Sequence, residues 1–171
     1  NVGRPIGPTM LQEYSDIIAS TRMAGVNRLD NHSTEFTKEK QKYPSYKAFY
    51  ADSLFFRVFS NEFISGDPDK ALKEPFSVVL TESLAKKIFG EEEAYGKTVE
   101  FEESGANITV TVTGVIRDYK GRTHMPYEAL ISWRSRPNWD AFDQNWFGSH
   151  VYTYVLLSEK HDTDSFLAKF P

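Results

Sequence analysis

Two short segments carry the spacing of phosphate-binding or acyl-transfer motifs. Gly96-Lys97-Thr98 matches the end of a P-loop, in which backbone N–H groups and a lysine hold phosphates. The full motif needs a glycine where this chain has Glu91, and the acidic run that begins there would repel phosphates. The lysine also precedes a predicted strand instead of opening a helix. We therefore expect no nucleotide binding by this chain.

A second segment, Ser83-Leu84-Ala85-Lys86, fits the S-x-x-K pattern of penicillin-recognising enzymes, in which the serine is a nucleophile. The companion S-D-N and K-T-G signals are missing from the sequence. We interpret Ser83 as a surface residue, and Lys86 as a cation near the carboxyl end of a helix, where it complements the helix dipole.

Metal and cysteine chemistry have little support in the sequence. The chain has no cysteine, which excludes disulfides, thiolate metal sites and cysteine nucleophiles. Its histidines, which form no i, i+4 pair or H-E-x-x-H helix, are His32, His124, His150 and His161. We expect no metal and no cofactor. The 24 acidic residues leave open a hydrolase with two carboxylates far apart in sequence, but the spacing favours no pair.

Residues 133–147 combine aromatic and polar side chains outside any recognisable element. Tryptophan and arginine are enriched where proteins bind one another. The candidate contact residues are Arg134, Arg136, Trp139, Trp146 and Phe147. Two other interpretations stay open: the rings cover the core beneath a long connection, or they stack against sugar rings.

Composition describes a folded domain with an ordinary surface. Aromatic residues make up 15% of the 171 positions, too many for a disordered chain, and 26% are charged. The net charge of −4 argues against nucleic-acid binding. No run of about 18 apolar residues is present, so no segment is expected to span a membrane.

The first third of the chain is predicted to mix short elements. We expect a helix opened by Thr9 with Gln12 completing a capping box, then a strand at 18–26. Residues 27–45 are expected to be irregular. A strand at 46–51 precedes a short apolar helix at 54–59, capped by Asp52 or Ser53, whose phenylalanines belong to the core.

The clearest unit is a strand at 77–80 followed by a helix with Thr81 as N-cap and Gly90 just past its end. Segments 98–101 and 108–116 alternate as a hairpin, with a bulge or close backbone approach at Gly114. Strands at 128–132 and 151–157 and a helix from Asp164 follow. This order predicts an α+β fold in which mixed, short-stranded sheets pack against helices.

An ordered series of segments resembles the MacB-like periplasmic core domain of FtsX/LolC-type ABC transporter permeases, in the version common in Bacteroidetes-type bacteria. The segments are Ala51–Phe59, Gly66-Asp67-Pro68, Ala71-Leu72, Val78–Gly90, Gly96-Lys97-Thr98, Val112–Asp118, Thr123-His124 and Tyr152–Leu157. The resemblance runs from about residue 9 to 170, whereas residues 133–147 match no pattern of the family.

The resemblance implies a non-enzymatic domain on the periplasmic side of the inner membrane, between the first and second transmembrane helices of a permease. A separate cytoplasmic ATPase would use ATP. Further partners would be a periplasmic protein or a second permease copy, with no nucleic acid. Both ends of the chain, Asn1 and Pro171, are expected to be cut from a longer protein.

The resemblance also implies two lobes within a single domain of residues 1–171. Residues 1–60 with 150–171 would form a membrane-proximal βα lobe, and residues 61–149 an inserted lobe. A single fused body is the alternative. The rival function is a soluble periplasmic module that binds a peptide or a sugar.

Overall fold

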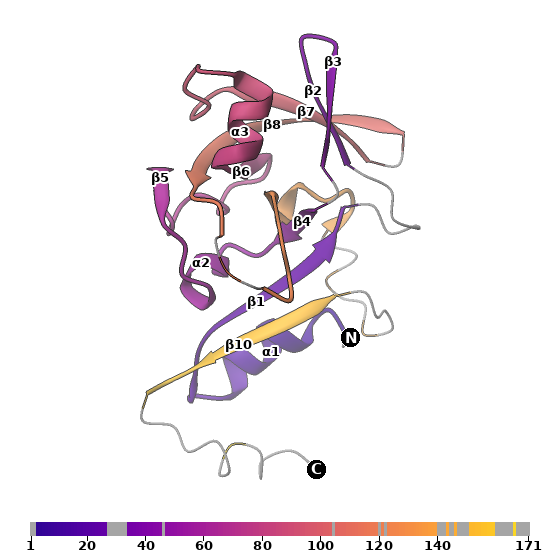
Figure 1. The fold of residues 1–171 in the computed structure, drawn as a ribbon. Coiled ribbons are helices and arrows are strands. Elements are labelled where there is room, and N and C mark those ends of the chain that lie inside the picture. The colour runs from indigo at the N-terminus through magenta and orange to yellow at the C-terminus, as the bar shows by residue number, and fades with distance from the viewer. Residues whose placement is uncertain are drawn as a thin grey trace.

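The computed structural model contains one mixed β-sheet, to which all of its strands belong (Figure 1). The residues that the structure describes are 3–26, 34–45, 47–103, 105–119, 121, 123–139, 143, 146, 151–159 and 166. The helices are α1 (Ile6–Glu13), α2 (Phe55–Val58) and α3 (Glu82–Phe89), with a 3-10 helix, η1 (Trp133–Ser135). The strands are β1 (Ile17–Gly25), β2 (Thr34–Lys38), β3 (Gln41–Ser45), β4 (Ala48–Ala51), β5 (Phe63–Gly66), β6 (Ser77–Thr81), β7 (Thr98–Glu103), β8 (Ala106–Ile116), β9 (Ala129–Ser132) and β10 (Tyr152–Leu157).

The sheet runs in the order β10-β1-β4-β9-β6-β8-β7-β2-β3, and β5 pairs with the last residues of β8. The pairs β4–β9 and β6–β8 are parallel, whereas the other described pairs are antiparallel. This mixed sheet with few helices confirms the predicted α+β class. None of the helices among the described residues has the length and apolar character needed to cross a bilayer.

The central strands are buried on both faces. Along β6, Val78 and Leu80 belong to one apolar cluster, which includes the inner face of α3, and Val79 belongs to another, which includes α2. Successive side chains of a strand point to opposite faces, so β6 separates the two clusters. Phe55 and Phe56 lie in the second cluster, which confirms their prediction as core residues.

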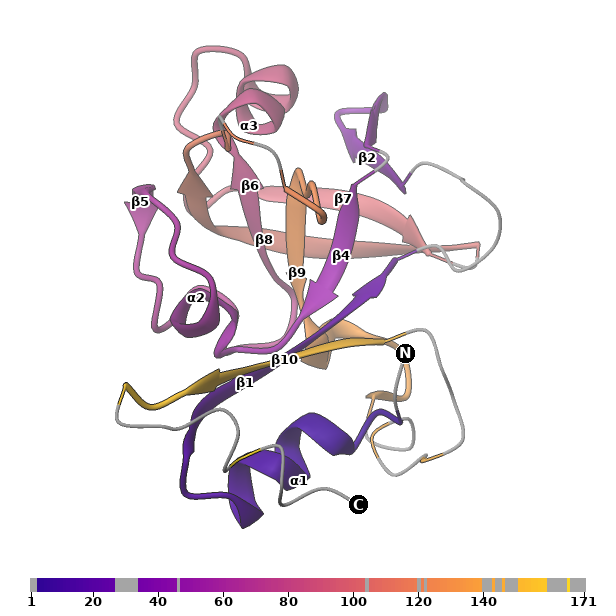
Figure 2. The ribbon, with the colours of Figure 1, turned by 60° about the horizontal axis from the view of Figure 1, so that its bottom comes forward.

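Helix α1 packs at the other side of the molecule, along β1 and β10 (Figure 2). Gly7 makes this approach possible, because a Cβ atom there would lie 2.9 Å from the Thr153 methyl group. The prediction that Thr9 opens this helix was wrong. Pro5 precedes the first helical residue, and Pro8 fits in the first turn because its missing N–H would have no partner there.

The prediction of irregular structure was also wrong for residues 34–45, which form the β2–β3 hairpin; residues 27–33 lie outside the described part. Glu39 and Lys40 both have positive φ in the turn, a conformation usually signalled by asparagine and glycine. The sequence therefore lacked the usual hairpin signal. Strand β5 was also not predicted from the sequence. Asp52 and Ser53 do not cap α2, since no side chain caps that helix.

Local signals in the middle of the chain were confirmed. The Thr81 hydroxyl accepts a hydrogen bond from the Leu84 N–H, and Gly90 ends α3 with a φ of 65°. The β7–β8 hairpin forms as expected. Opposite β6, the register slips between Val112 and Gly114, and a Cβ atom on Gly114 would lie 2.8 Å from the Phe63 ring. The predicted bulge and close approach therefore occur together.

Two predictions about the ends and the domain division stay open. Of the predicted helix from Asp164, only Phe166 is described; it is helical and buried, and its ring packs edge-on against Tyr14 at 5.9 Å. Strands from both proposed lobes share the sheet, since β4 pairs with β9 and β2 pairs with β7. The division into lobes stays a prediction.

Candidate functional site

The segment that follows β9 begins with a buried tryptophan beside two arginines. Trp133 opens η1 and is almost fully buried. The guanidinium carbons of Arg22 and Arg136 lie 4.5 Å and 5.6 Å from its ring centroid, within the range of cation–π attraction. Arg136 is itself buried and lies 5.8 Å from the Tyr50 ring. Trp133 thus connects the end of β9 to β1 and β4.

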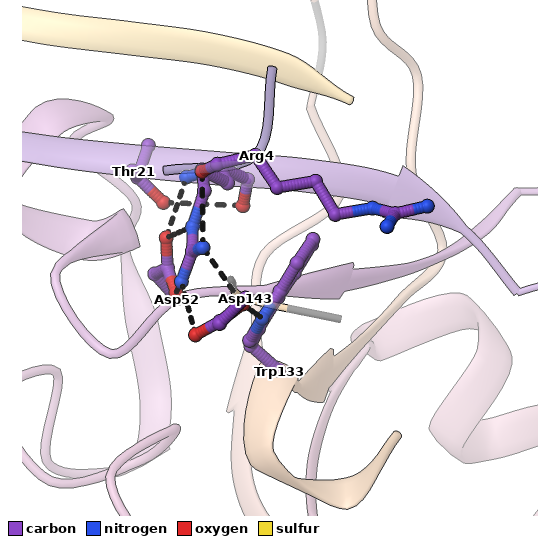
Figure 3. A network of polar contacts seen from close by, with 6 residues as sticks. Arg4, Thr21, Asp52, Trp133 and Asp143 are labelled. Atoms are coloured by element: carbon purple, nitrogen blue, oxygen red, sulfur yellow. Dashed lines mark hydrogen bonds and ion pairs between the residues drawn. The ribbon is translucent and has the colours of Figure 1, made fainter. Parts of the chain in front are cut away.

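Arg22 is the centre of a buried polar network (Figure 3). Its backbone N–H and its Nε and Nη2 groups donate to the carboxylate of Asp52, just past β4, at 2.8–2.9 Å. Its Nη1 donates to Asp143 Oδ1 at 2.9 Å and to the Arg4 carbonyl oxygen at 3.1 Å. The Trp133 indole N–H donates to the same oxygen of Asp143 at 2.9 Å.

Two carboxylates surround one guanidinium in this network. Burial lowers the pKa of Arg22, but the hydrogen bonds and charges of Asp52 and Asp143 outweigh that effect and raise the pKa above its ordinary value. Arg22 therefore stays charged at every physiological pH. The pairs fix three chain segments against β1: the N-terminal segment, the end of β4 and the segment that contains Asp143.

The N-terminal segment also touches the 133–146 region directly. A Cβ atom on Gly3 would lie 2.8 Å from the Trp146 carbonyl oxygen, so the two backbones are in close contact. The Arg4 carbonyl adds an indirect link, since Arg22 on β1 donates both to it and to Asp143. The start of the chain therefore packs close to Trp146.

The predicted contact residues differ in exposure. Trp146 is 54% exposed, and Arg134 is exposed with its guanidinium carbon 5.6 Å from the centroid of the half-buried Trp139 ring. Arg136 is buried against Trp133 and Tyr50, and Phe147 lies outside the described residues. The structure thus brings Arg134 and Trp139 together, whereas Arg136 faces the interior.

Sequence reasoning missed Arg22, Asp52 and Asp143 as a unit. A signal was available, because Arg22 interrupts the apolar strand that spans residues 17–25. An arginine on such a strand is buried only when carboxylates pair with it. The partners themselves could not be found, since they lie 30 and 121 positions further along the chain.

The residues of the rejected catalytic motifs have other partners. The Ser83 hydroxyl donates to Asp118 at 2.5 Å, and the Lys86 ammonium pairs with Glu91 at 2.9 Å. Lys97 pairs with Glu92 at the surface. Within the described residues, no three histidine or acidic side chains group closely enough to hold a metal ion.

Comparisons of sequence and of fold with known proteins agree with each other. The family model described as the MacB-like periplasmic core domain matches residues 7–170. No curated protein sequence matches the chain. A solved domain of a protein assigned as a permease, from Porphyromonas gingivalis, shares 23% identity and a TM-score of 0.78, over 96% of this chain and 72% of that one.

Two further solved structures have similar folds. The periplasmic region of MacB from Actinobacillus actinomycetemcomitans shares 19% identity and a TM-score of 0.70, over 99% of this chain and 71% of that one. The extracellular domain of the noncanonic ABC-type transporter YknZ from Gram-positive bacteria shares 14% identity and a TM-score of 0.57, over 94% and 74%. At these identities the similarity shows a shared fold, and the Porphyromonas structure is consistent with the Bacteroidetes-type resemblance.

Proposed function

Because the chain belongs to the family of MacB-like periplasmic core domains, we propose that it couples movement of permease membrane helices to a contact surface on the periplasmic side. Domains of this family are the periplasmic parts of ABC-type transporter permeases. We define the contact surface as the exposed side chains of Arg134 and Trp146 and the half-buried side chain of Trp139, together with the buried Arg136 and with Phe147, which is next in sequence. Its occupant would be the transported substrate, a periplasmic partner protein or a second permease copy.

The exposure of Trp146 supports a binding role for this surface. Tryptophan is enriched among the residues that carry most of the binding energy at protein interfaces. The stacking of Arg134 on Trp139 holds two residue types typical of interface hot spots in a fixed arrangement, which lowers the entropy lost on binding. Transport would need no covalent chemistry or bound cofactor in this domain, and a cytoplasmic ATPase would supply the energy.

The observation that carries the coupling role is the Arg22 network. Its guanidinium holds the Arg4 carbonyl and the Asp143 carboxylate at once, so the N-terminal segment is linked through one side chain to Asp143, which lies between Trp139 and Trp146 in the sequence. In a permease, a membrane helix preceding the N-terminal segment would pull on this attachment when ATP is hydrolysed. The contact surface would then move with the helix.

Site-specific photo-crosslinking in the intact permease tests this proposal. A photoreactive residue at Trp146 is expected to give a defined adduct in cells, and the adduct should weaken when Arg134→Ala removes the stacking partner of Trp139. Ile64 on β5 is a matched control, since it is 45% exposed and lies outside the contact surface. The same adduct from both positions, or none from position 146, would contradict a binding role here.

A further inference from the structure

A second concave region lies apart from the contact surface, between α2, α3 and the connection that leads from β8 to β9. This α2–α3 cavity has a volume of about 650 Å³, within the range of roughly 300–1,000 Å³ typical of small-molecule sites. None of the contact-surface residues lines it. Its lining comes from the α2 segment, one face of α3, Lys47 before β4, and residues 117–119, 121 and 123–128.

One end of the cavity is apolar and aromatic. Phe55 and Phe59 of the α2 segment pack ring to ring at 5.0 Å, and Tyr127 meets Phe55 edge-on at 5.4 Å. The Tyr127 hydroxyl donates to the Asn61 side chain at 2.9 Å, so the ring presents its apolar body to the cavity without an unsatisfied hydroxyl. Met125 and Pro126 complete this end. The surface suits a hydrocarbon or aromatic group.

The other end is basic. Lys47 and Lys87 line it together with Glu128, whose carboxylate accepts the Ser45 hydroxyl at 2.7 Å. The Lys87 ammonium donates to the Pro44 carbonyl oxygen at 2.9 Å, which uses one of its three N–H groups. Neither lysine forms an ion pair with a carboxylate in the described part of the chain. Two ammonium groups thus face one carboxylate.

Several other polar groups of the cavity already have partners. Asp118 accepts from the hydroxyl and the backbone N–H of Ser83, and Arg117, which also lines the cavity, pairs with Glu82 and Glu62. The His124 ring nitrogen lies 3.0 Å from the Tyr154 hydroxyl. Lys87 keeps two N–H donors and Lys47 forms no ion pair in the described part of the chain, so a ligand beside these lysines would supply acceptors.

We propose that the α2–α3 cavity binds a small amphipathic anion. Its apolar body would lie against the half-buried rings of Phe59 and Tyr127, which pack on Phe55, and its carboxylate, phosphate or sulfate head would accept hydrogen bonds from Lys47 and Lys87. A charge-assisted hydrogen bond is stronger than a neutral one, so the two ammonium groups select anions over neutral or cationic amphiphiles. This site is independent of the coupling role, because binding can be measured on the 171-residue chain alone.

Fluorescence titration with 8-anilinonaphthalene-1-sulfonate, an anionic aromatic amphiphile, tests the site. Lys87→Glu is expected to weaken binding about ten-fold or more, the scale of one hydrogen bond to a charged group. The matched control is Lys86→Glu on the same helix, because Lys86 pairs with Glu91 and does not line the cavity. Equal weakening by both variants would overturn the proposal, since it would reflect net charge alone.

Competition identifies the ligand class. Dodecanoate is expected to displace the probe, whereas dodecyltrimethylammonium and an acidic hexapeptide should not at equal concentration. A Tyr119→Ala variant removes an exposed ring that lines the cavity and should weaken dodecanoate binding without unfolding the chain. Equal displacement by the cationic amphiphile would refute an anion site, and displacement by the hexapeptide alone would point to a peptide groove instead.

Discussion

Asp52→Asn is expected to destabilise the fold strongly, although it removes no carbon atom. The Asp52 carboxylate accepts three N–H groups of Arg22, whose side chain is 5% exposed, while its own side chain is 19% exposed. Removing one partner of a buried ion pair costs about 3–5 kcal/mol. Asp143 still compensates part of the charge, which favours the lower end, about 3 kcal/mol. For a chain of this size that corresponds to a fall in Tm of roughly 6–12 °C.

A double-mutant cycle separates the ion pair from other effects of the substitution. The free energy of unfolding is measured by urea titration, with far-ultraviolet circular dichroism and tryptophan fluorescence as probes. In an Arg22→Met background, Asp52→Asn should cost less than about 1 kcal/mol, because no guanidinium is left to lose a partner. Asp69→Asn is the control, since its pair with Arg57 is exposed and 3.4 Å long, and should cost at most about 0.5 kcal/mol. An equal cost in both backgrounds would refute the reasoning.

Further predictions concern backbone strain and alkaline pH. Gly66→Ala should cost well over about 2 kcal/mol, because Gly66 has a φ of 94° and a Cβ atom there would lie 2.4 Å from the Thr113 carbonyl oxygen. Gly105→Ala, also at positive φ but in open space, should cost only about 1 kcal/mol in the same urea titration, and equal costs would argue against the clash. Burial raises the pKa of Tyr50 and of Tyr127 above the ordinary value, so both bind protons more tightly in the folded chain. Their contribution to the free energy of unfolding should be complete below about pH 10. It should be lost as the pH rises further, because the two tyrosines then ionise only in the unfolded chain. Tyr127→Phe should make this decline in the urea midpoint shallower between pH 9 and 11, and an unchanged slope would exclude Tyr127 as its source.

Elements with strong local signals were predictable. Thr81 and Gly90 delimit α3 because a hydroxyl that accepts a backbone N–H and a residue that tolerates positive φ act within one turn of chain. The β7–β8 hairpin follows from alternation of apolar and polar residues, which needs no distant partner. Where the local signal was weak, prediction failed: the β2–β3 turn uses Glu39 and Lys40 at positive φ, and only the packing of Phe36 in the core explains that hairpin.

The candidate sites, too, were only partly predictable from the sequence. The aromatic and arginine content of residues 133–147 was visible in the sequence, but the structure shows Trp133 and Arg136 buried and Trp146 exposed. Lys47 and Lys87 are unremarkable in sequence, and they line one cavity because the segment before β4 lies beside α3, where the Lys87 ammonium donates to the Pro44 carbonyl oxygen. Which of several chemically suitable residues face water depends on how the strands pair.

By itself, the sequence determined the α+β class and the central strand–helix unit, because propensity, capping and periodicity act over a few residues. The family followed from the resemblance of an ordered series of segments, which the family model over residues 7–170 confirms. Only the tertiary structure decided that Arg22, Asp52 and Asp143 form one network, and that two lysines share a cavity with an aromatic floor. Those groupings join positions up to 121 residues apart. No local pattern encodes such contacts, since they depend on the strand order β10-β1-β4-β9 that the whole core selects.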